Sequence, residues 1–339
     1  MAGPYARFMN DWENRLANSD SNRVERPFEW GLDWLELASG NGNPANDLSK
    51  YVEAGLADSS SFFAYRKPDG FAFNSSMELQ FPSPIESRYA ENNTVHAQYF
   101  PSPRSNGRAV LVIPQWNSTP DGHFGLCKLL NWHGFSALRL SLAYHHRRMP
   151  PELERADYHM SSNLGRTIHA MRQSVIDTRA CLDWLEQQGY HRLGILGTSL
   201  GSCVALLAAT HDGRLKAGVF NHISMHVAEV VWTGISCRHI RKSLDGYLSL
   251  DELRHYWSLI SPAPFLPRLQ SNPLKNLLIW AEHDTTFRPE YSRHVLEVFQ
   301  QLQLHHEVVK LPCGHYTSGK LPFNVWDGLA MCNFLYRML

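Results

Sequence analysis

Short apolar segments recur through most of the chain, and longer segments with helical periodicity separate them. Between Asn163 and Gly189, apolar residues recur at spacings of three and four, which predicts a helix with one buried face. The short segments are bounded by turn residues, so we interpret them as strands. They cover residues 109–113, 136–140, 193–196, 217–220, 277–280 and 306–311. Strands that alternate with helices predict an α/β fold, with a mainly parallel, twisted sheet that helices cover on both faces.

The first 76 residues have a different pattern, and we interpret them as an N-terminal helical extension. Apolar residues repeat every fourth position from Phe8 to Leu16. We expect this extension to pack on the main domain, residues 77–339; an alternative is that it forms a wall of a ligand pocket. Residues 77–99 have the proline-punctuated, extended pattern of an antiparallel hairpin.

A second departure from the strand–helix alternation falls between about residues 222 and 267. This stretch is rich in Trp, Tyr, His and Arg, and we interpret it as a helical cap inserted into the main domain. Additions at the carboxyl edge of a sheet commonly shape a substrate pocket, so we expect aromatic side chains of the insertion to line it. These side chains are Trp232, Tyr247, Tyr256, Trp257 and Phe265.

The composition favours a large folded domain and argues against nucleic-acid binding. Of the 339 residues, 43% are hydrophobic and 12% aromatic, which is ample for a sizeable core. The 32 basic residues balance 32 acidic ones, whereas a nucleic-acid surface normally shows as an excess of basic charge. No apolar run reaches transmembrane length, and the stretch from Met1 to Leu16 is too polar for a signal peptide. We therefore expect a cytoplasmic protein with no transmembrane segment.

Cysteine and histidine spacing predicts neither disulfides nor a metal site. The six cysteines fall irregularly and mostly inside predicted elements, which is typical of reduced core residues. His145 and His146 are adjacent, with His123 and His133 nearby in sequence, but adjacent histidines point in different directions. No carboxylate or cysteine is spaced to complete a site. We expect no metal and no other cofactor.

Ser199 is the strongest candidate for chemistry. It is the central residue of a G-x-S-x-G motif at residues 197–201, which follows a predicted strand and precedes small, helix-compatible residues. In such a strand–turn–helix context the serine adopts a strained conformation, so its neighbours must be small. Its hydroxyl is then held above the sheet, near the free N–H groups of the helix N-terminus. We predict that Ser199 is a nucleophile.

A serine nucleophile needs a base and a carboxylate, and both are expected at the carboxyl ends of later strands. The strand at 277–280 runs into Asp284, and the strand at 306–311 runs into His315. Glu282 is close enough in sequence to be the acid instead, and Asp284 could merely cap the following helix. The order along the chain is therefore serine, acid, histidine.

With these motifs in this order, the chain resembles the α/β-hydrolase superfamily over roughly residues 85–339. The resemblance implies that Ser199 is the nucleophile, Asp284 the acid and His315 the general base. It also implies an oxyanion hole made by the backbone N–H of Leu200 and one N–H from the loop after strand 109–113. That loop contains Gln115 and Trp116 where many relatives have His-Gly; we favour Trp116 as the donor.

The segment at residues 144–151 and the helical extension resemble a little-characterised abhydrolase-domain type. Arg147 and Arg148 follow Tyr144 and two histidines in this segment, at the sheet edge where the three catalytic candidates should converge. An arginine fork suits a carboxylate or phosphate, so one hypothesis is that Arg147 and Arg148 bind an anionic group of the substrate. Gln115 and Tyr144 are further possible substrate-binding residues. The alternative is that the arginines pair with acidic neighbours in the loop. These neighbours are Glu152, Glu154 and Asp157.

The function predicted from these features is a serine hydrolase that cleaves a small-molecule carboxylic ester, thioester or lactone through an acyl-enzyme. A peptidase or an acyltransferase would use the same three residues. A non-catalytic binding protein on the same fold is a third alternative, because a fold does not determine a function.

Overall fold

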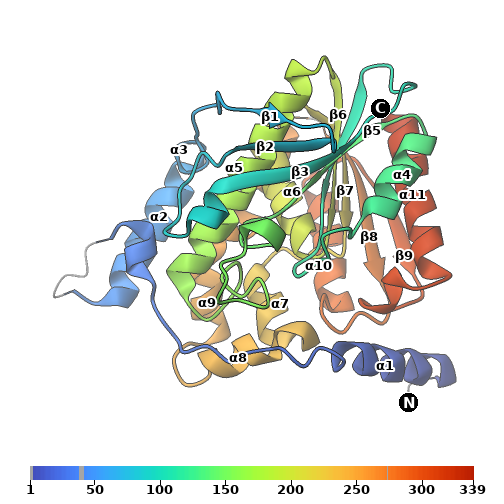
Figure 1. Ribbon diagram of the computed structural model, residues 1–339. Coiled ribbons are helices and arrows are strands. Elements are labelled where there is room, and N and C mark those ends of the chain that lie inside the picture. Colours follow the sequence, from blue (N-terminus) through green and yellow to red (C-terminus); the bar gives the residue numbers. More distant parts are fainter. Residues whose placement is uncertain (1–2, 38–41, 273) are drawn as a thin grey trace.

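The computed structural model describes residues 3–37, 42–272 and 274–339. Within these ranges, nine strands form one sheet in the order β1-β2-β3-β5-β4-β6-β7-β8-β9 (Figure 1). β3 pairs antiparallel with β2 and β5, whereas the strands from β5 to β9 in this order pair in parallel. The strands are β1 (Ala72–Phe73), β2 (Glu78–Pro82), β3 (Thr94–Phe100), β4 (Arg108–Ile113), β5 (Ser136–Leu140), β6 (Arg192–Thr198), β7 (Leu215–Asn221), β8 (Lys275–Ala281) and β9 (His306–Leu311).

This sheet confirms the predicted fold class. All six predicted strands of the parallel part lie where the apolar segments indicated, and β2 and β3 form the antiparallel hairpin expected between residues 77 and 99. The predicted fold needs both faces of the parallel strands to be buried, because each face packs against helices. In β4, five of the six residues are buried.

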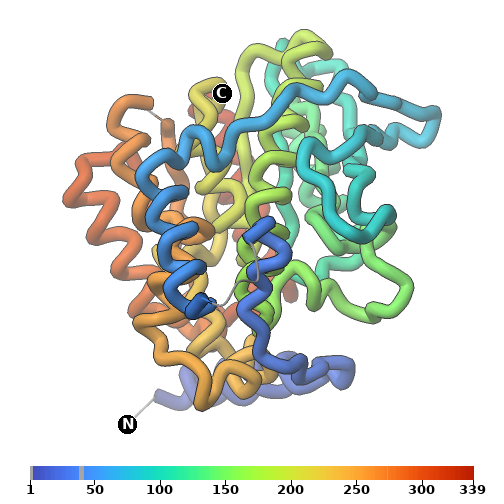
Figure 2. Tube along the Cα trace, turned by 90° about the vertical axis from the view of Figure 1, so that its left-hand side faces the viewer, coloured from blue at the N-terminus to red at the C-terminus, as the bar shows by residue number. Residues whose placement is uncertain are grey.

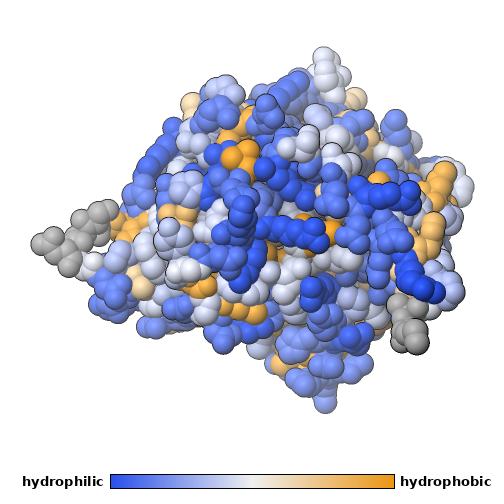
Figure 3. All heavy atoms as spheres, turned by 90° about the horizontal axis from the view of Figure 1, so that it is seen from below, coloured by the Kyte–Doolittle hydropathy of each residue, from blue (hydrophilic) through white to orange (hydrophobic). Residues whose placement is uncertain are grey.

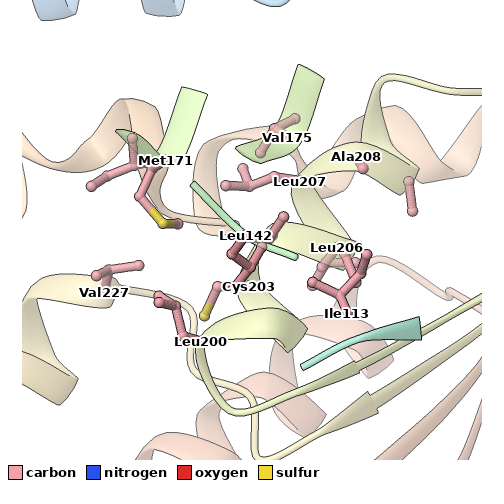
Figure 4. Packing of buried hydrophobic residues seen from close by; sticks show 14 of the residues in the cluster. Ile113, Leu142, Met171, Val175, Leu200, Cys203, Leu206, Leu207, Ala208 and Val227 are labelled. Carbon is pink, nitrogen blue, oxygen red and sulfur yellow. The ribbon is translucent and has the colours of Figure 1, made fainter. Parts of the chain in front are cut away.

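Helices cover the sheet in two layers. Buried residues of α5 (Leu164–Gln187), α6 (Leu200–Thr210) and α10 (Pro289–Gln301) pack with Leu111 and Ile113 of β4 in one core cluster (Figure 4). Buried residues of α1 (Pro4–Ala17), α4 (Phe124–Trp132) and α11 (Phe323–Met338) pack with Val110 and Val112 in the other. Side chains of a strand point alternately to opposite faces, so successive β4 residues belong to different layers.

The stretch at residues 222–267 and the N-terminal region are both mainly helical. Figure 2 shows the N-terminal segments running beside α5 and the helices of the 222–267 stretch. The helices of these two regions are α2 (Pro44–Ala57), α3 (Ser59–Phe62), α7 (Val227–Thr233), α8 (Arg238–Leu244) and α9 (Leu250–Tyr256). The 3-10 helices of the chain are η1 (Leu32–Leu35), η2 (Ala90–Asn93), η3 (His146–Arg148), η4 (Ile235–Cys237), η5 (Ser258–Ile260), η6 (Ala263–Gln270) and η7 (Thr317–Gly319).

The aromatic residues of the 222–267 stretch stabilise the structure rather than leaving a pocket open. Trp257 and Phe265 are buried in the core cluster that contains α5. Tyr247 stacks on Phe28 of the N-terminal region, with ring centroids 4.6 Å apart. The expectation that these side chains line a substrate pocket is therefore wrong for Trp257 and Phe265, because the core takes up their apolar surface. Tyr247 packs on the extension but stays largely exposed.

The molecular surface near α1 and α8 is predominantly hydrophilic. Figure 3 shows this side of the molecule, where hydrophobic residues form small areas separated by hydrophilic ones. Among the described residues, no helix combines the length and the apolar composition needed to span a bilayer.

Candidate active site

Ser199 lies in a strained turn between β6 and α6. Its φ of 56° and ψ of −124° are rarely adopted by residues other than glycine. A Cβ atom at Gly197 would overlap the carbonyl oxygen of Gly201, and one at Gly201 would overlap the carbonyl oxygen of Ile113. Both flanking glycines are therefore required for the turn to pack this closely against β4.

His315 and Asp284 lie beside Ser199 and form a continuous chain of hydrogen bonds with it. The Ser199 hydroxyl lies 3.1 Å from Nε2 of His315, whose Nδ1 lies 3.0 Å from Oδ2 of Asp284. Glu282, the alternative acid, instead forms a half-exposed ion pair with Lys310. The structure thus brings Asp284, and not Glu282, to the histidine.

Both oxygens of the Asp284 carboxylate accept two hydrogen bonds each. Its Oδ1 accepts hydrogen bonds of 2.7 Å from the backbone N–H groups of Thr286 and Phe287. Its Oδ2 accepts one from His315 and a second, of 2.8 Å, from Nδ1 of His222. A carboxylate has about four lone-pair sites, so these four bonds saturate it and fix its orientation.

These contacts shift the pKa values of the histidine and the carboxylate in opposite directions. Burial lowers the pKa of His315, but the charge and the hydrogen bond of Asp284 outweigh it, so the pKa lies above the ordinary 6.5. Burial alone would raise the pKa of Asp284; the two imidazoles bring it far below the ordinary 3.8. Asp284 therefore stays ionised at the pH where His315 changes charge, which lies above 6.5.

His222 is a member of this site that the sequence analysis missed. It is buried, and its ring packs against the ring of His315 with centroids 4.7 Å apart. Burial, partly offset by the hydrogen bond to Asp284, lowers the pKa of His222, so it faces the carboxylate as a neutral donor. Its position directly after β7 was a usable signal, but His222 also begins the stretch that is rich in Trp, Tyr, His and Arg and that we interpreted as an insertion.

His222, Asp284 and His315 are also the described residues whose spacing would suit a metal ion, with ligand atoms within 4.8 Å of one another. The distances between their atoms, 2.8 and 3.0 Å, are those of hydrogen bonds. Both histidines donate an Nδ1–H to the carboxylate, so the geometry fits a hydrogen-bonded group better than a set of metal ligands.

The loop that follows β4 borders Ser199 and is held in place by side-chain contacts. The backbone N–H of Asn117 donates to Nε2 of His145, 3.0 Å away, and the indole N–H of Trp116 donates to the carbonyl oxygen of Ala156 at 2.9 Å. Burial lowers the pKa of His145 well below its usual range, so it stays a neutral acceptor at Nε2. His145 thus anchors the loop that contains the candidate oxyanion donor.

The assignment of the oxyanion donors remains a prediction. Leu200 begins α6, so its N–H lies among the free donors of the helix N-terminus. Gln115 and Trp116 both line the cavity beside Ser199.

Tyr144, Arg147 and Arg148 do not line that cavity, so the anion-binding hypothesis is wrong in its placement of the two arginines. Arg148 is fully buried, and its guanidinium lies 2.8 Å from Asp177 of α5. Arg147 is largely exposed and binds Glu78. Tyr144 is buried among the tyrosines that surround it.

The expected loop partners of the arginines were also wrong. Tyr144 and His146 have positive φ values, so the backbone turns sharply there. The turn sends Arg148 into the interior and Arg147 toward β2, and Asp157 instead pairs with Arg26.

The loop that contains His315 contacts the N-terminal helix. Glu13 of α1 is completely buried, and a Cβ atom at Gly314 would overlap its side chain. Only glycine lets the chain approach the helix this closely. The N-terminal extension thus contacts the loop that contains His315, and Asp20 of the extension lies in the wall of the cavity beside Ser199.

A cavity of about 780 Å³ opens beside Ser199 and His315. It extends between α4 and α11, and it is large enough for a small-molecule ligand. None of the five aromatic residues expected from the 222–267 stretch lines it. Its lining includes Gln115, Trp116, His123, Leu126, Leu129, Arg155, Thr198, Ser199, Asn221, His222, His315, Val325, Asp327, Leu329 and Met331.

Solved structures with the same fold include esterases and a peptidase. Acetyl xylan esterase 1 from Thermoanaerobacterium sp. JW/SL YS485 is 15% identical with a TM-score of 0.57, over 96% of this chain and 98% of that one. The esterase Pf2001 from Pyrococcus furiosus is 16% identical with a TM-score of 0.53, over 93% and 99%. The acylaminoacyl peptidase from Pyrococcus horikoshii is 15% identical with a TM-score of 0.58, over 80% of this chain but 42% of that one. At such low sequence identities, the structural likeness shows a shared fold and nothing more specific.

No curated protein matches the sequence significantly. Residues 64–245, more than half of the chain, match the family described as alpha/beta hydrolase domain containing 18. The matched residues include β2 to β7 and the turn that contains Ser199. The chain belongs to this family of the α/β-hydrolase superfamily.

Proposed function

We propose that the protein hydrolyses a carboxylic ester, with Ser199 as nucleophile, His315 as general base and Asp284 as the carboxylate that orients the histidine. Nε2 of His315 takes the hydroxyl proton as the Ser199 oxygen attacks the carbonyl carbon. The imidazolium is stabilised by Asp284, and it then gives the proton to the leaving alcohol. Water repeats the cycle with His315 as base and releases the acid from the acyl-enzyme.

The oxyanion of the tetrahedral intermediate would be bound by backbone N–H groups. The N–H of Leu200 and the N–H of Trp116, with Gln115 as the alternative, are the donors that we assign. The contacts of His145 and Ala156 hold this loop, so the second donor would be preorganised. Thioesters and lactones would react through the same steps.

The observation that carries the proposal is the unbroken chain from Ser199 to Asp284, with contacts of 3.1 and 3.0 Å, at the wall of a large cavity. The strained backbone at Ser199 also favours catalysis over simple binding, because such strain costs on the order of 1–3 kcal/mol. The esterases among the similar solved structures support the same reaction class.

Peptide hydrolysis is the second candidate, because one similar structure is an acylaminoacyl peptidase. This chain spans only 42% of that protein. An amide has a poorer leaving group than an ester, so amide and ester substrates with the same acyl group distinguish the two functions.

The test is a series of p-nitrophenyl esters with acyl chains of increasing length, together with p-nitroanilides of the same acyl groups. We expect ester turnover that Ser199→Ala reduces by at least about 10³-fold. Ser236→Ala is the matched control, because Ser236 lines the same cavity. Ester turnover that survives in Ser199→Ala would contradict the proposal, and a preference for the anilides would favour the peptidase.

A further inference from the structure

The cavity beside Ser199 is polar at one end and apolar along one wall. The polar end is formed by side chains at the carboxyl ends of β6 and β7 and by Asp327 of α11. The apolar wall is formed by side chains of α4 and α11, namely Leu126, Leu129, Val325, Leu329 and Met331. A ligand that fills this space therefore needs both an apolar body and polar groups at one end.

Asp327 and Asn221 form the centre of the polar end. Both are more than nine-tenths buried, and Nδ2 of Asn221 donates a 2.7 Å hydrogen bond to Oδ2 of Asp327. The second oxygen of each side chain, Oδ1, has no hydrogen-bond partner among the described residues. Burial raises the pKa of Asp327 to about 7, although the Asn221 amide lowers it.

A buried carboxylate whose one hydrogen-bond partner is a neutral amide destabilises the protein when no ligand is bound. Buried polar groups are nearly always paired, and each unpaired group costs about 1–3 kcal/mol. Gln115, in the candidate oxyanion loop, is a third residue of the same lining with an unpartnered side-chain oxygen, Oε1. Three lining residues whose buried oxygens have no partner favour a ligand that supplies hydrogen-bond donors once these side chains turn toward it.

The position of His315 decides which part of an ester would reach these acceptors. His315 lines the large cavity, and it must give its proton to the oxygen of the leaving alcohol. The leaving alcohol therefore extends into this cavity. Arg155 and Asp20 both line the cavity and lie 3.5 Å apart, so their charges balance each other there. Neutral hydroxyl groups can donate to the unpaired oxygens without adding a charge to this lining.

Resting on the proposed function, we propose that Asp327 and Asn221 bind free hydroxyl groups on the alcohol part of the ester, so that the substrate is an ester of a polyhydroxy alcohol. The apolar wall of α4 and α11 contacts the carbon skeleton of that alcohol. Sites that bind a substrate hydroxyl discriminate strongly against analogues without it, because their polar groups are then left unpaired.

The experiment compares glycerol 1-monobutyrate with propyl butyrate, which share the acyl group and the length of the alcohol and differ in two hydroxyls. We expect kcat/KM of the wild-type protein to favour the glycerol ester by at least about 10-fold. Asp327→Leu, close to isosteric and apolar, should bring this ratio to within about 3-fold of one, and Asp327→Asn should give an intermediate ratio. A wild-type ratio near one would overturn the proposal.

A structural role for Asp327 gives a different result. Removing a poorly paired buried carboxylate should keep or raise Tm in Asp327→Leu. Equal losses of kcat/KM on both esters, with a fall in Tm, would show that Asp327 only supports the fold and would overturn the proposal.

Direct binding separates this inference from the proposed function. In the Ser199→Ala protein, calorimetric titration with glycerol 1-monobutyrate should show binding that a further Asp327→Leu change weakens by at least about 10-fold. Binding that is equally strong in both proteins would overturn the hydroxyl site whatever the catalytic result. If the ester binds in this way but the wild-type protein does not hydrolyse it, the proposed function fails and the site stands.

Gly125 offers a test that leaves the polar residues intact. It lies in α4 at the cavity, and a Cβ atom there would meet no atom within 4 Å. Gly125→Ala should fold well, and Gly125→Leu should narrow the cavity and lower kcat/KM for the glycerol ester by about 10-fold. Unchanged kinetics in Gly125→Leu would place the alcohol elsewhere and contradict the proposal.

Discussion

Glu13, in the first helix of the chain, binds Thr317 in the loop that contains His315. Its Oε1 accepts hydrogen bonds of 2.7 Å from both the backbone N–H and the hydroxyl of Thr317, and its Oε2 accepts one of 3.0 Å from the N–H of Tyr316. The carboxylate is completely buried. The N-terminal helix therefore holds the loop of the candidate base across more than 300 residues of sequence.

We predict that Glu13→Gln lowers kcat by about 10-fold, because the amide cannot accept all three hydrogen bonds and the loop then loses its fixed position. The charge of Glu13 also raises the pKa of His315. The acid limb of the pH–rate profile should therefore move to lower pH, which a merely loosened loop would not cause. Asp11→Asn, at an exposed position of the same helix, is the control. A lower kcat with an unmoved pH profile would remove the electrostatic part of this role.

The proposed mechanism predicts a definite pH dependence. His315 acts as a base only when it is neutral, and its pKa lies above 6.5. Activity should therefore rise with pH, with its half-maximum above pH 6.5, while Asp284 stays ionised throughout because its pKa is far below 3.8. Profiles of kcat/KM from pH 5 to 9 check this. A half-maximum below pH 6.5 would contradict it.

Asp284→Asn should change both the rate and the profile. Without the carboxylate, burial is the main influence left on His315, so its pKa should fall below 6.5. The rate should fall by about 10³–10⁴-fold, because the histidine loses its orientation. Glu282→Gln, at the same strand end, should have little effect. If Glu282→Gln is the more damaging change, the choice of acid is wrong.

His222 should act as a positioning residue for Asp284. His222→Leu removes one of the four hydrogen bonds of the carboxylate, and we expect kcat to fall by about 10-fold. The half-maximum of the pH profile should rise, because Asp284 then interacts more strongly with His315. His222→Asn keeps an N–H close to the position of Nδ1 and should recover most of both effects. Equal kcat values and equal pH profiles in His222→Leu and His222→Asn would show that the hydrogen bond to Asp284 does not matter.

The buried pair of Arg148 and Asp177 predicts a stability effect. Both side chains are fully buried, so Arg148→Met leaves a buried carboxylate without its cation, and unfolding should become easier by about 3–5 kcal/mol. Adding Asp177→Leu should recover most of that loss. Arg147→Gln, which breaks an exposed pair, should cost less than about 1 kcal/mol. Urea denaturation measures all three, and equal losses for Arg147→Gln and Arg148→Met would contradict the assignment.

Local patterns in the sequence were sufficient to predict the parallel strands, the antiparallel hairpin beside them and the three residues that meet at the carboxyl edge of the sheet. Ser199 directly follows β6, and Asp284 and His315 lie in the short loops after β8 and β9. Parallel strands place these ends together. Arg148 could not be placed in this way, because positive φ values at Tyr144 and His146 redirect the side chains of the turn. Its partner, Asp177, lies on a helix that begins later in the chain.

The contacts of Glu13 and Asp327 also could not be predicted from the sequence. Each is an acidic residue on a helix, and an acid in that setting usually faces water. Only the packing of α1 against the His315 loop and of α11 against β7 buries them. The N-terminal region thus contributes to the candidate site through a contact that periodicity does not reveal.

Covalent labelling with a fluorophosphonate, followed by mass spectrometry of the labelled peptide, tests the proposed chemistry most directly. We predict one adduct, on the Ser199 hydroxyl, that forms faster as pH rises through the pKa of His315 and is lost in Ser199→Ala, while Ser236→Ala is labelled like the wild-type protein. An adduct on another residue, or no adduct on a folded protein across pH 5 to 9, would contradict the assignment of Ser199 as an activated nucleophile.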